Sequence, residues 1–326
     1  MRLPETPPGA ENPFVFLVGC ARSGTTLLQR IVGAHPLIAM PPETHWVPRF
    51  YRKRTGVNDD DTVTPKLVEA LAGNRHFQKM EISRETLEGF LCNGHPVSYA
   101  EFVGKLFSHF AALQGKPLAG DKTPGYERRL PLLHALWPGA KFIHLIRDGR
   151  DVCLSMLNWQ KAPRSAGRFA CWADDPVCTT AFWWKWHVLL GRQYARALPS
   201  PLHTEVRYEV LVQESRATTR ALCEFLGLAF DERMLNFNEG RTVDDPALDA
   251  KHAWRPITAG LRDWHTQMAP GDVEKFEACA GDVLEQLGYE RPRVAVSHQT
   301  VELARRVRDA FAKDVLGRGH ALPDQW

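Results

Sequence analysis

Apolar runs alternate with amphipathic segments along this chain, and the two patterns predict strands and helices in turn. Residues 14–18 (FVFLV) form a continuous apolar run, which is typical of a strand buried on both faces of a parallel sheet. Residues 141–146 (KFIHLI) repeat the pattern, and shorter strands are predicted within 37–40, 117–124 and 203–209. Strands that alternate with helical segments favour a doubly wound, mostly parallel α/β sheet.

Helical spacing of apolar residues follows most of these strands. The first helix runs to Gly33, with Pro36 as a stop, and another ends near Trp159. A long helix is predicted at 179–198, with Thr179 or Thr180 as its cap, and a loop at 163–176 precedes it. Three more helices are predicted at 217–227, where Gly227 ends the helix, at 272–287 and at 298–313.

The chain of 326 residues is interpreted as one domain, 1–326, with two helical additions. Residues 50–115 are polar and mainly helical in pattern, which predicts a cap inserted into the sheet. Residues 290–326 are interpreted as a C-terminal helical tail.

The first strand leads into GCARSGTT, residues 19–26, which has the spacing of a phosphate-binding loop. Backbone N–H groups at a helix start bind anions, and Arg22, Thr25 and Thr26 add a charge and two hydroxyls. Nucleotide triphosphatases have Lys where Thr25 stands. Because that Lys reaches the β and γ phosphates, its absence predicts a smaller anion, bound without metal. The alternative is a tight turn whose glycines serve only its geometry.

A second candidate anion site follows the strand at 141–146. Arg147 comes at the carboxyl end of that strand, where open α/β sheets place their ligands. Ser155 lies two turns into the next helix, so its hydroxyl and the Arg147 guanidinium can converge on a phosphate. The alternative is a common ion pair between Arg147 and an aspartate, and Arg150 is interpreted as a solvated side chain.

Composition excludes several classes of protein. The net charge is only +3, so the overall balance does not favour a nucleic-acid partner. Seven cysteines at irregular spacing predict neither a disulfide framework nor a zinc site. No apolar stretch is long enough to span a bilayer, and the polar start lacks a signal pattern, so we expect a soluble cytoplasmic protein.

Four motifs in order, RSGTTLLQRIVGAHP, PET, DKTP and RDGRDVCLSM, resemble the sulfotransferases that use 3′-phosphoadenosine-5′-phosphosulfate. The resemblance extends from Phe14 to about Trp264 and is nearest the branch that holds the tyrosylprotein sulfotransferases and many bacterial enzymes. It implies a P-loop-like fold and a 5′-phosphosulfate loop made of Arg22, Ser23, Gly24, Thr25 and Thr26. It also implies that Arg147 and Ser155 bind the 3′-phosphate and that no metal is required.

The resemblance also implies the catalytic groups. Glu43 matches the family's glutamate base and follows the second strand, where a carboxylate can take the proton of an acceptor hydroxyl. His45 is the alternative base and is otherwise interpreted as substrate-lining or structural. Lys122, in DKTP, matches the lysine that contacts the sulfuryl group, with Arg22 beside it. An exposed loop glutamate and a surface lysine are the alternatives.

Two more nucleotide contacts are implied, Tyr208 and Arg262, although Tyr208 can equally be a core residue. The tryptophans at 183, 184 and 186 are interpreted as core residues. We therefore expect sulfuryl transfer to a hydroxyl of a small-molecule, lipid or carbohydrate acceptor. The alternatives are a P-loop kinase or nucleotide-binding protein using ATP-Mg, and protein-tyrosine sulfation. A homodimer is one possible assembly of the chain.

Overall fold

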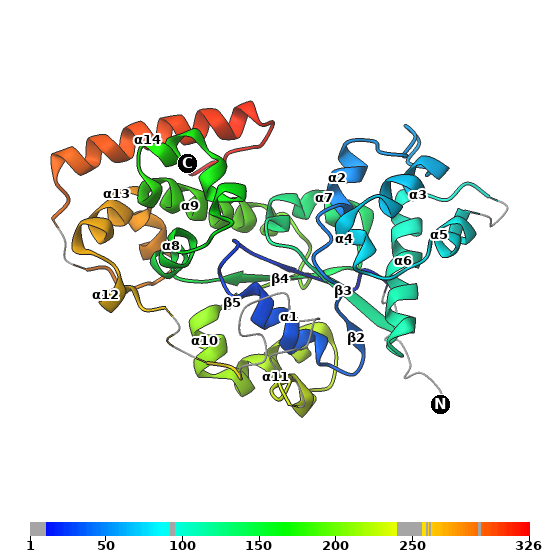
Figure 1. Ribbon diagram of the computed structural model, residues 1–326. Coiled ribbons are helices and arrows are strands. Elements are labelled where there is room, and N and C mark those ends of the chain that lie inside the picture. The colour runs from blue at the N-terminus through cyan, green and yellow to red at the C-terminus, as the bar shows by residue number, and fades with distance from the viewer. Residues whose placement is uncertain (1–10, 92–94, 240–255, 259, 261, 293–294) are drawn as a thin grey trace.

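The computed structural model describes residues 11–91, 95–239, 256–258, 260, 262–292 and 295–326. Across these residues, five strands form one sheet in the order β2-β3-β1-β4-β5, and all neighbours are parallel (Figure 1). The predicted doubly wound parallel sheet is confirmed. The strands are β1 (Val15–Val18), β2 (Ile38–Ala39), β3 (Leu118–Lys122), β4 (Lys141–Ile146) and β5 (His203–Arg207).

Alternate residues of β1 pack on opposite faces of the sheet, as the two-residue period of a strand requires. Val15 and Leu17 belong to the core beneath the sheet, and Phe16 and Val18 belong to the core on the other face. The first core is covered by three helices: α1 (Thr25–Gly33), α10 (Tyr208–Gln213) and α11 (Ser215–Leu226). The sequence pattern FVFLV is therefore apolar throughout because both faces are covered.

Five helices lie in sequence between β2 and β3, and they pack on the second face together with α7 (Leu130–Leu136). Figure 1 shows them gathered at one end of the sheet, on the side of β2 and β3. They are α2 (Val47–Arg52), α3 (Pro65–Ala72), α4 (Arg75–Gln78), α5 (Arg84–Leu91) and α6 (Tyr99–Leu113). We call these five the cap helices.

A third core holds the helices at the opposite end of the sheet. The tryptophans at 183, 184 and 186 are buried in it, which confirms their interpretation as core residues. The Trp186 indole donates to the carbonyl of Ala321 at 2.8 Å, so the C-terminal segment lies over α9. The helices are α8 (Gly149–Leu157), α9 (Pro176–Ala195), α12 (Trp264–Gln267), α13 (Pro270–Gln286) and α14 (His298–Gly317).

Two predicted boundaries are wrong. Helix α9 begins at Pro176 and its cap is Asp175, whose Oδ1 accepts from the Cys178 amide at 2.8 Å, instead of Thr179 or Thr180. Those two hydroxyls donate to carbonyls one turn earlier. Strand β5 ends at Arg207, so Tyr208 begins helix α10.

Short 3-10 turns complete the described elements. The predicted loop at 163–176 contains η3 (Ala166–Arg168) and η4 (Ala170–Ala173), preceded by η2 (Ala162–Arg164). The others are η1 (Tyr126–Arg129) after β3 and η5 (Glu232–Met234) after α11. Among the described residues, no helix has both the length and the apolar character needed to cross a membrane.

Candidate active site

The glycine loop joins β1 to α1, and two of its glycines are required by their surroundings. A Cβ on Gly19 would lie 2.5 Å from the carbonyl oxygen of Leu145 on the neighbouring strand β4. Gly24 has φ +93°, and a Cβ there would lie 2.4 Å from Cδ2 of Tyr208. Gly24 also precedes α1 without a side-chain cap, so no side chain occupies the positive end of that helix.

Arg22 connects this loop to the second predicted anion site. Its Nε donates to Oγ of Ser155 on α8 at 3.0 Å, and its guanidinium lies 4.9 Å from the centre of the Trp159 ring. Arg22 has φ +74°, a conformation uncommon outside glycine that tends to mark functional sites. Burial lowers the pKa of Arg22, and the nearby charges of Arg262 and Arg147 lower it further. The structure therefore brings the loop, Ser155 and three arginines together.

Arg147 lies at the carboxyl end of β4 and faces Tyr208. Its guanidinium lies 4.3 Å from the centre of the Tyr208 ring and pairs with the Asp151 carboxylate at 3.0 Å. The Trp184 indole donates to the Arg147 carbonyl at 3.1 Å, which holds the backbone in place. Tyr208 thus touches both Gly24 and Arg147, and it closes one side of the glycine loop.

Glu43, His45 and Lys122 form one hydrogen-bonded group at the end of neighbouring strands β2 and β3. The Lys122 ammonium pairs with Oε1 of Glu43, and Nε2 of His45 lies 2.9 Å from Oε2. The Lys122 side chain is only 3% exposed, whereas those of Glu43 and His45 are 35% and 40% exposed. A molecule in solution can therefore reach the carboxylate and the imidazole.

Opposing effects act on the Glu43 carboxyl. Burial raises its pKa, but the hydrogen bond from His45 and the charge of Lys122 outweigh burial and lower the pKa to about 2. Glu43 is therefore ionised near neutral pH. His45, with φ +52°, is a second non-glycine residue held in a left-handed conformation beside this group.

Asp121 fixes the relation between these two strand ends. Its carboxylate accepts from the Thr44 hydroxyl at 2.5 Å and from the Thr123 hydroxyl at 3.0 Å. The Thr44 amide in turn donates to the Thr123 hydroxyl at 3.0 Å. Burial raises the pKa of Asp121 to about 6 despite these bonds. The residue after Glu43 is thereby tied to the residues on both sides of Lys122.

Sequence reasoning missed a buried carboxylate beneath the glycine loop. Glu127, on η1, accepts from the Gly19 amide at 3.2 Å and also contacts Nδ1 of His187 on α9. Burial lowers the pKa of His187 to about 4, so the neutral ring donates Nδ1–H to the Glu127 carboxylate near pH 7. No local pattern indicates this contact, because the three residues come from distant parts of the chain.

Arg150 corrects another expectation, because it is fully buried rather than solvated. It pairs with Asp148 at 2.7 Å and Glu277 at 3.3 Å, and its guanidinium lies 3.6 Å from the centre of the Trp264 ring. These contacts fasten α8 to α12 and α13, so Arg150 stabilises the fold. Among the described residues, no cluster of His, Cys, Asp or Glu could hold a metal ion.

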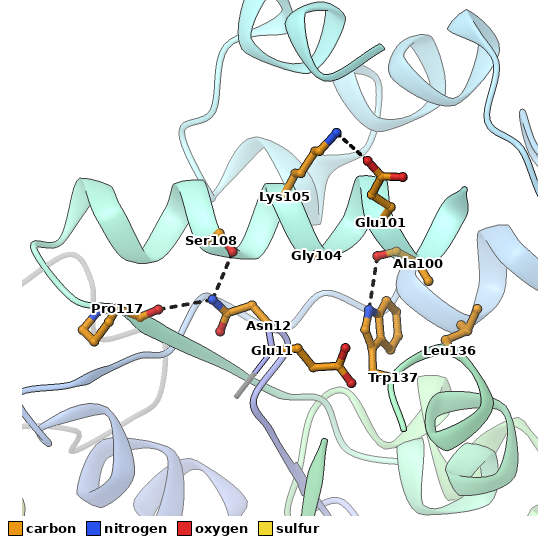
Figure 2. A pocket seen from close by; sticks show the side chains of 10 residues that line it. All are labelled: Glu11, Asn12, Ala100, Glu101, Gly104, Lys105, Ser108, Pro117, Leu136 and Trp137. Atoms are coloured by element: carbon orange, nitrogen blue, oxygen red, sulfur yellow. Dashed lines mark hydrogen bonds and ion pairs between the residues drawn. The ribbon is translucent and has the colours of Figure 1, made fainter. Parts of the chain in front are cut away.

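A pocket of about 460 Å³ lies away from these residues, between α6 and the segments that lead into β1 and β3 (Figure 2). Asn12 donates to the Ser108 hydroxyl and the Pro117 carbonyl, Lys105 pairs with Glu101, and Trp137 donates to Ala100. Its position before the strands places it at the amino edge of the sheet, opposite to the glycine loop. These mutually paired groups carry no catalytic arrangement.

Comparison with known proteins agrees with this geometry. Residues 13–232 match the model of the "Sulfotransferase family". Protein-tyrosine sulfotransferase 2 of Gallus gallus is 25% identical over 291 residues, which cover 86% of this chain and 70% of the relative. Nodulation protein NoeE of Sinorhizobium fredii is 25% identical over 303 residues, covering 85% and 66%.

The fold comparison points the same way. The sulfotransferase domain from the curacin biosynthetic pathway superposes with a TM-score of 0.59 at 21% identity, covering 87% of this chain and all of that domain. The likeness to this structure establishes the fold, which is P-loop-like, and the family match covers more than half of the chain. The chain belongs to the sulfotransferase family.

Proposed function

We propose that this sulfotransferase moves the sulfuryl group of 3′-phosphoadenosine-5′-phosphosulfate to a hydroxyl of a small-molecule, lipid or carbohydrate acceptor. The observation that carries the proposal is the contact of Glu43 with Lys122 at the ends of two adjacent strands. It puts a solvent-accessible carboxylate and a buried cation beside the strand that leads into the glycine loop, where Lys122 pairs with Leu17 of β1.

Unused donor groups around the loop support a phosphate-bearing donor. Oγ of Ser23 and Nε of Arg147 are buried, and neither has a hydrogen-bond partner. Buried polar groups are normally paired, so these two are suited to the anionic oxygens of a ligand. The residues present therefore fit the donor molecule, which supplies the sulfuryl group when bound.

Each end of the donor has its own set of residues in this proposal. The loop amides, Arg22, Thr25 and Thr26 bind the 5′-phosphosulfate. Arg147 and Ser155 bind the 3′-phosphate and so determine the donor's register. Tyr208 and Arg262 contact the nucleotide, which the proximity of Tyr208 to Arg147 and of Arg262 to Arg22 supports.

Glu43 and Lys122 act on the acceptor side. Glu43 takes the proton of the attacking hydroxyl, and Lys122 stabilises charge on the departing phosphate oxygen. In the free protein the hydrogen bond from His45 and the charge of Lys122 hold the Glu43 carboxylate ionised. A bound anion gives Lys122 a second partner, which weakens its effect on Glu43 and raises the proton affinity of the carboxylate. His45 orients Glu43 from the other side and remains the alternative base.

The test begins with the donor product, adenosine 3′,5′-bisphosphate. It should raise the melting temperature of the protein through binding linkage, and 5′-AMP, which lacks the 3′-phosphate, should raise it less. Mass spectrometry should then find acceptor products heavier by about 80 Da, the mass of SO₃, in a metabolite extract. Equal effects of the two nucleotides would contradict the proposal, and a Mg²⁺-dependent response to ATP would favour a kinase. A product on protein tyrosine would instead give this chain the activity named for its relatives.

We also propose that the protein acts in the cytoplasm. The six cysteines in the described residues are buried free thiols, which suits a reducing compartment. Fractionation of the source cells would test this location, and size-exclusion chromatography with light scattering would test the homodimer.

A further inference from the structure

Four arginines gather around one histidine outside the groups described so far. They are Arg52 at the end of α2, Arg128 and Arg129 on η1, and Arg168 on η3, and the histidine is His320 near the C-terminus. We call them the arginine cluster. Arg129 donates from Nη2 to Nδ1 of His320 at 2.9 Å when that nitrogen is unprotonated.

The guanidinium of Arg128 is packed on an aromatic ring and has one shared counter-charge. It lies 4.4 Å from the centre of the Trp186 ring, while its Nε and Nη1 are buried without hydrogen-bond partners. Glu127 is the one carboxylate paired with it in the described residues, at 3.8 Å, and that carboxylate already binds His187 and Gly19. Two donors of Arg128 are therefore left without a protein partner, and 15% of its side chain is exposed.

Arg168 has the same character. Its guanidinium lies 5.1 Å from the centre of the Phe169 ring, and its Nε is buried without a partner. Within the described part of the chain, neither Arg52, Arg129 nor Arg168 forms an ion pair with a carboxylate. A purely structural arginine would normally be paired, as Arg150 is, because an unmatched buried charge is costly.

Burial and the neighbouring positive charges both lower pKa values in the arginine cluster. Burial lowers the pKa of Arg128 to about 10 against the opposing charge of Glu127, and the charges of Arg168 and Arg129 add to the lowering. Burial lowers the pKa of His320 to about 3, helped by all four arginines. His320 is therefore neutral near pH 7, and the cluster is a concentrated positive site with few counter-charges.

The cluster is connected to the proposed acceptor side of the active site. Helix α2 begins at Val47, soon after His45, and η1 begins at Tyr126, soon after Lys122. Both segments follow β2 and β3, whereas the donor residues Arg147 and Tyr208 follow β4 and β5 on the other side of β1. Arg128 is held close to the loop, since a Cβ on Gly125 would lie 2.8 Å from its Nη2, and the Gly125 amide donates to the Gly19 carbonyl at 3.2 Å.

We propose that the acceptor carries an anionic group, a phosphate, sulfate or carboxylate, which binds to the arginine cluster while its hydroxyl contacts Glu43. This inference rests on the proposed function. In the transfer, the acceptor oxygen forms a bond to sulfur and its proton goes to Glu43. The bond from sulfur to the phosphate oxygen breaks, and its electron pair leaves with that oxygen. The anionic group is unchanged and serves to position the hydroxyl.

The test measures anion binding separately from donor binding. The protein is first saturated with adenosine 3′,5′-bisphosphate, and then pyrophosphate or malonate is titrated by calorimetry. The wild-type protein should bind at least one of them. Arg128→Gln and Arg168→Gln should each weaken that binding by about tenfold or more, because a charge-assisted bidentate contact is lost. Arg192→Gln is the matched control, since Arg192 is paired with Glu205 at 3.0 Å outside the cluster, and it should bind like the wild type.

The outcomes of these titrations distinguish the kind of anionic group and separate this inference from the proposed function. Pyrophosphate binding alone indicates a phosphate or sulfate on the acceptor, and malonate binding alone indicates a carboxylate. If the bisphosphate binds but neither anion does, or if both Gln variants bind as the wild type does, the inference is wrong while the proposed function stands. Failure to bind the bisphosphate overturns the proposed function itself. If a Gln variant does not fold, Arg128→Lys and Arg168→Lys keep the charge and should retain part of the binding with fewer contacts.

Discussion

The Nε of Arg22 donates to Oγ of Ser155 at 3.0 Å, which joins the glycine loop after β1 to the helix after β4. The two motifs, separate in the sequence, are thus parts of one site. The bond also links the residues proposed to bind the 5′-phosphosulfate with those proposed to bind the 3′-phosphate. A ligand group that binds Ser155 must share that hydroxyl with Arg22.

Removal of the Ser155 hydroxyl should weaken only the binding of the 3′-phosphate. In Ser155→Ala we expect affinity for adenosine 3′,5′-bisphosphate to fall by about tenfold, because one hydrogen bond to a charged group is lost. Affinity for 5′-AMP should be almost unchanged. Calorimetric titration with both nucleotides measures the difference, and equal weakening of the two would assign Ser155 to the loop rather than to the 3′-phosphate.

Loss of the Glu43 carboxylate should affect turnover and spare donor binding. In Glu43→Ala we expect the rate of sulfuryl transfer to fall by about 10²- to 10⁴-fold, as for removal of a general base. The assay follows bisphosphate release in an acceptor-containing extract, and calorimetry checks that the donor product still binds. His45→Ala is the companion variant and should lose less. Full activity in Glu43→Ala with loss in His45→Ala would make His45 the base.

A side chain at Gly24 should disrupt the donor loop. In Gly24→Ala the new Cβ would meet Cδ2 of Tyr208 at 2.4 Å and take φ +93°. We expect a loss of about 2 kcal/mol or more in the free energy of unfolding, from steric overlap and backbone strain. Nothing lies within 4 Å of a Cβ at Gly89, in the helix α5.

Gly89→Ala is therefore the control for that variant. It should stabilise the protein by about 0.5–1 kcal/mol, because alanine favours a helix over glycine. Chemical denaturation of both variants measures the two effects. Equal stability of Gly24→Ala and the wild type would show that Tyr208 moves freely away from the loop.

The buried Asp121 carboxyl should make stability depend on pH. Its folded pKa of about 6 lies above the value of 3.8 usual for an aspartate, because the carboxyl is buried, so its protonated form is favoured in the folded state. The contribution of Asp121 to the free energy of unfolding is therefore greatest below the unfolded pKa. It is lost as pH rises through about 6, by at most about 3 kcal/mol. Asp121→Asn removes this titration. The difference in unfolding free energy between variant and wild type should shift in favour of the variant from pH 4 to pH 7, and a constant difference would contradict this account.

The sequence predicted the parallel sheet and the residues of the loop because both are local patterns. A continuous apolar run such as FVFLV identifies a doubly covered strand, and a glycine loop before a helix needs no tertiary information. The contact between Glu43 and Lys122 could be inferred only through the family resemblance. Their roles in catalysis remain predictions.

Other features depend on partners that are distant in the chain. Arg150 looked solvated because its partner Glu277 lies far along the sequence, and Glu127 has no local sign of its contact with Gly19. The cap of α9 was misplaced because aspartate at 175 competes successfully with the threonines at 179 and 180, whose hydroxyls bond within the helix instead. The arginine cluster was missed for the same reason, since its members come from α2, η1 and η3.

The pairing of β2 with β3 has a consequence for how this enzyme can be re-engineered. Glu43 follows β2 and Lys122 ends β3, and the separation of these adjacent parallel strands, about 4.8 Å, is set by backbone hydrogen bonds. The cap helices branch from the chain between those two strands without contributing either residue. The cap reaches this pair through His76 of α4, whose ring lies 4.6 Å from that of His45. Exchange of the cap for a foreign one that keeps this contact therefore offers a route to new acceptors that leaves Glu43 and Lys122 in register.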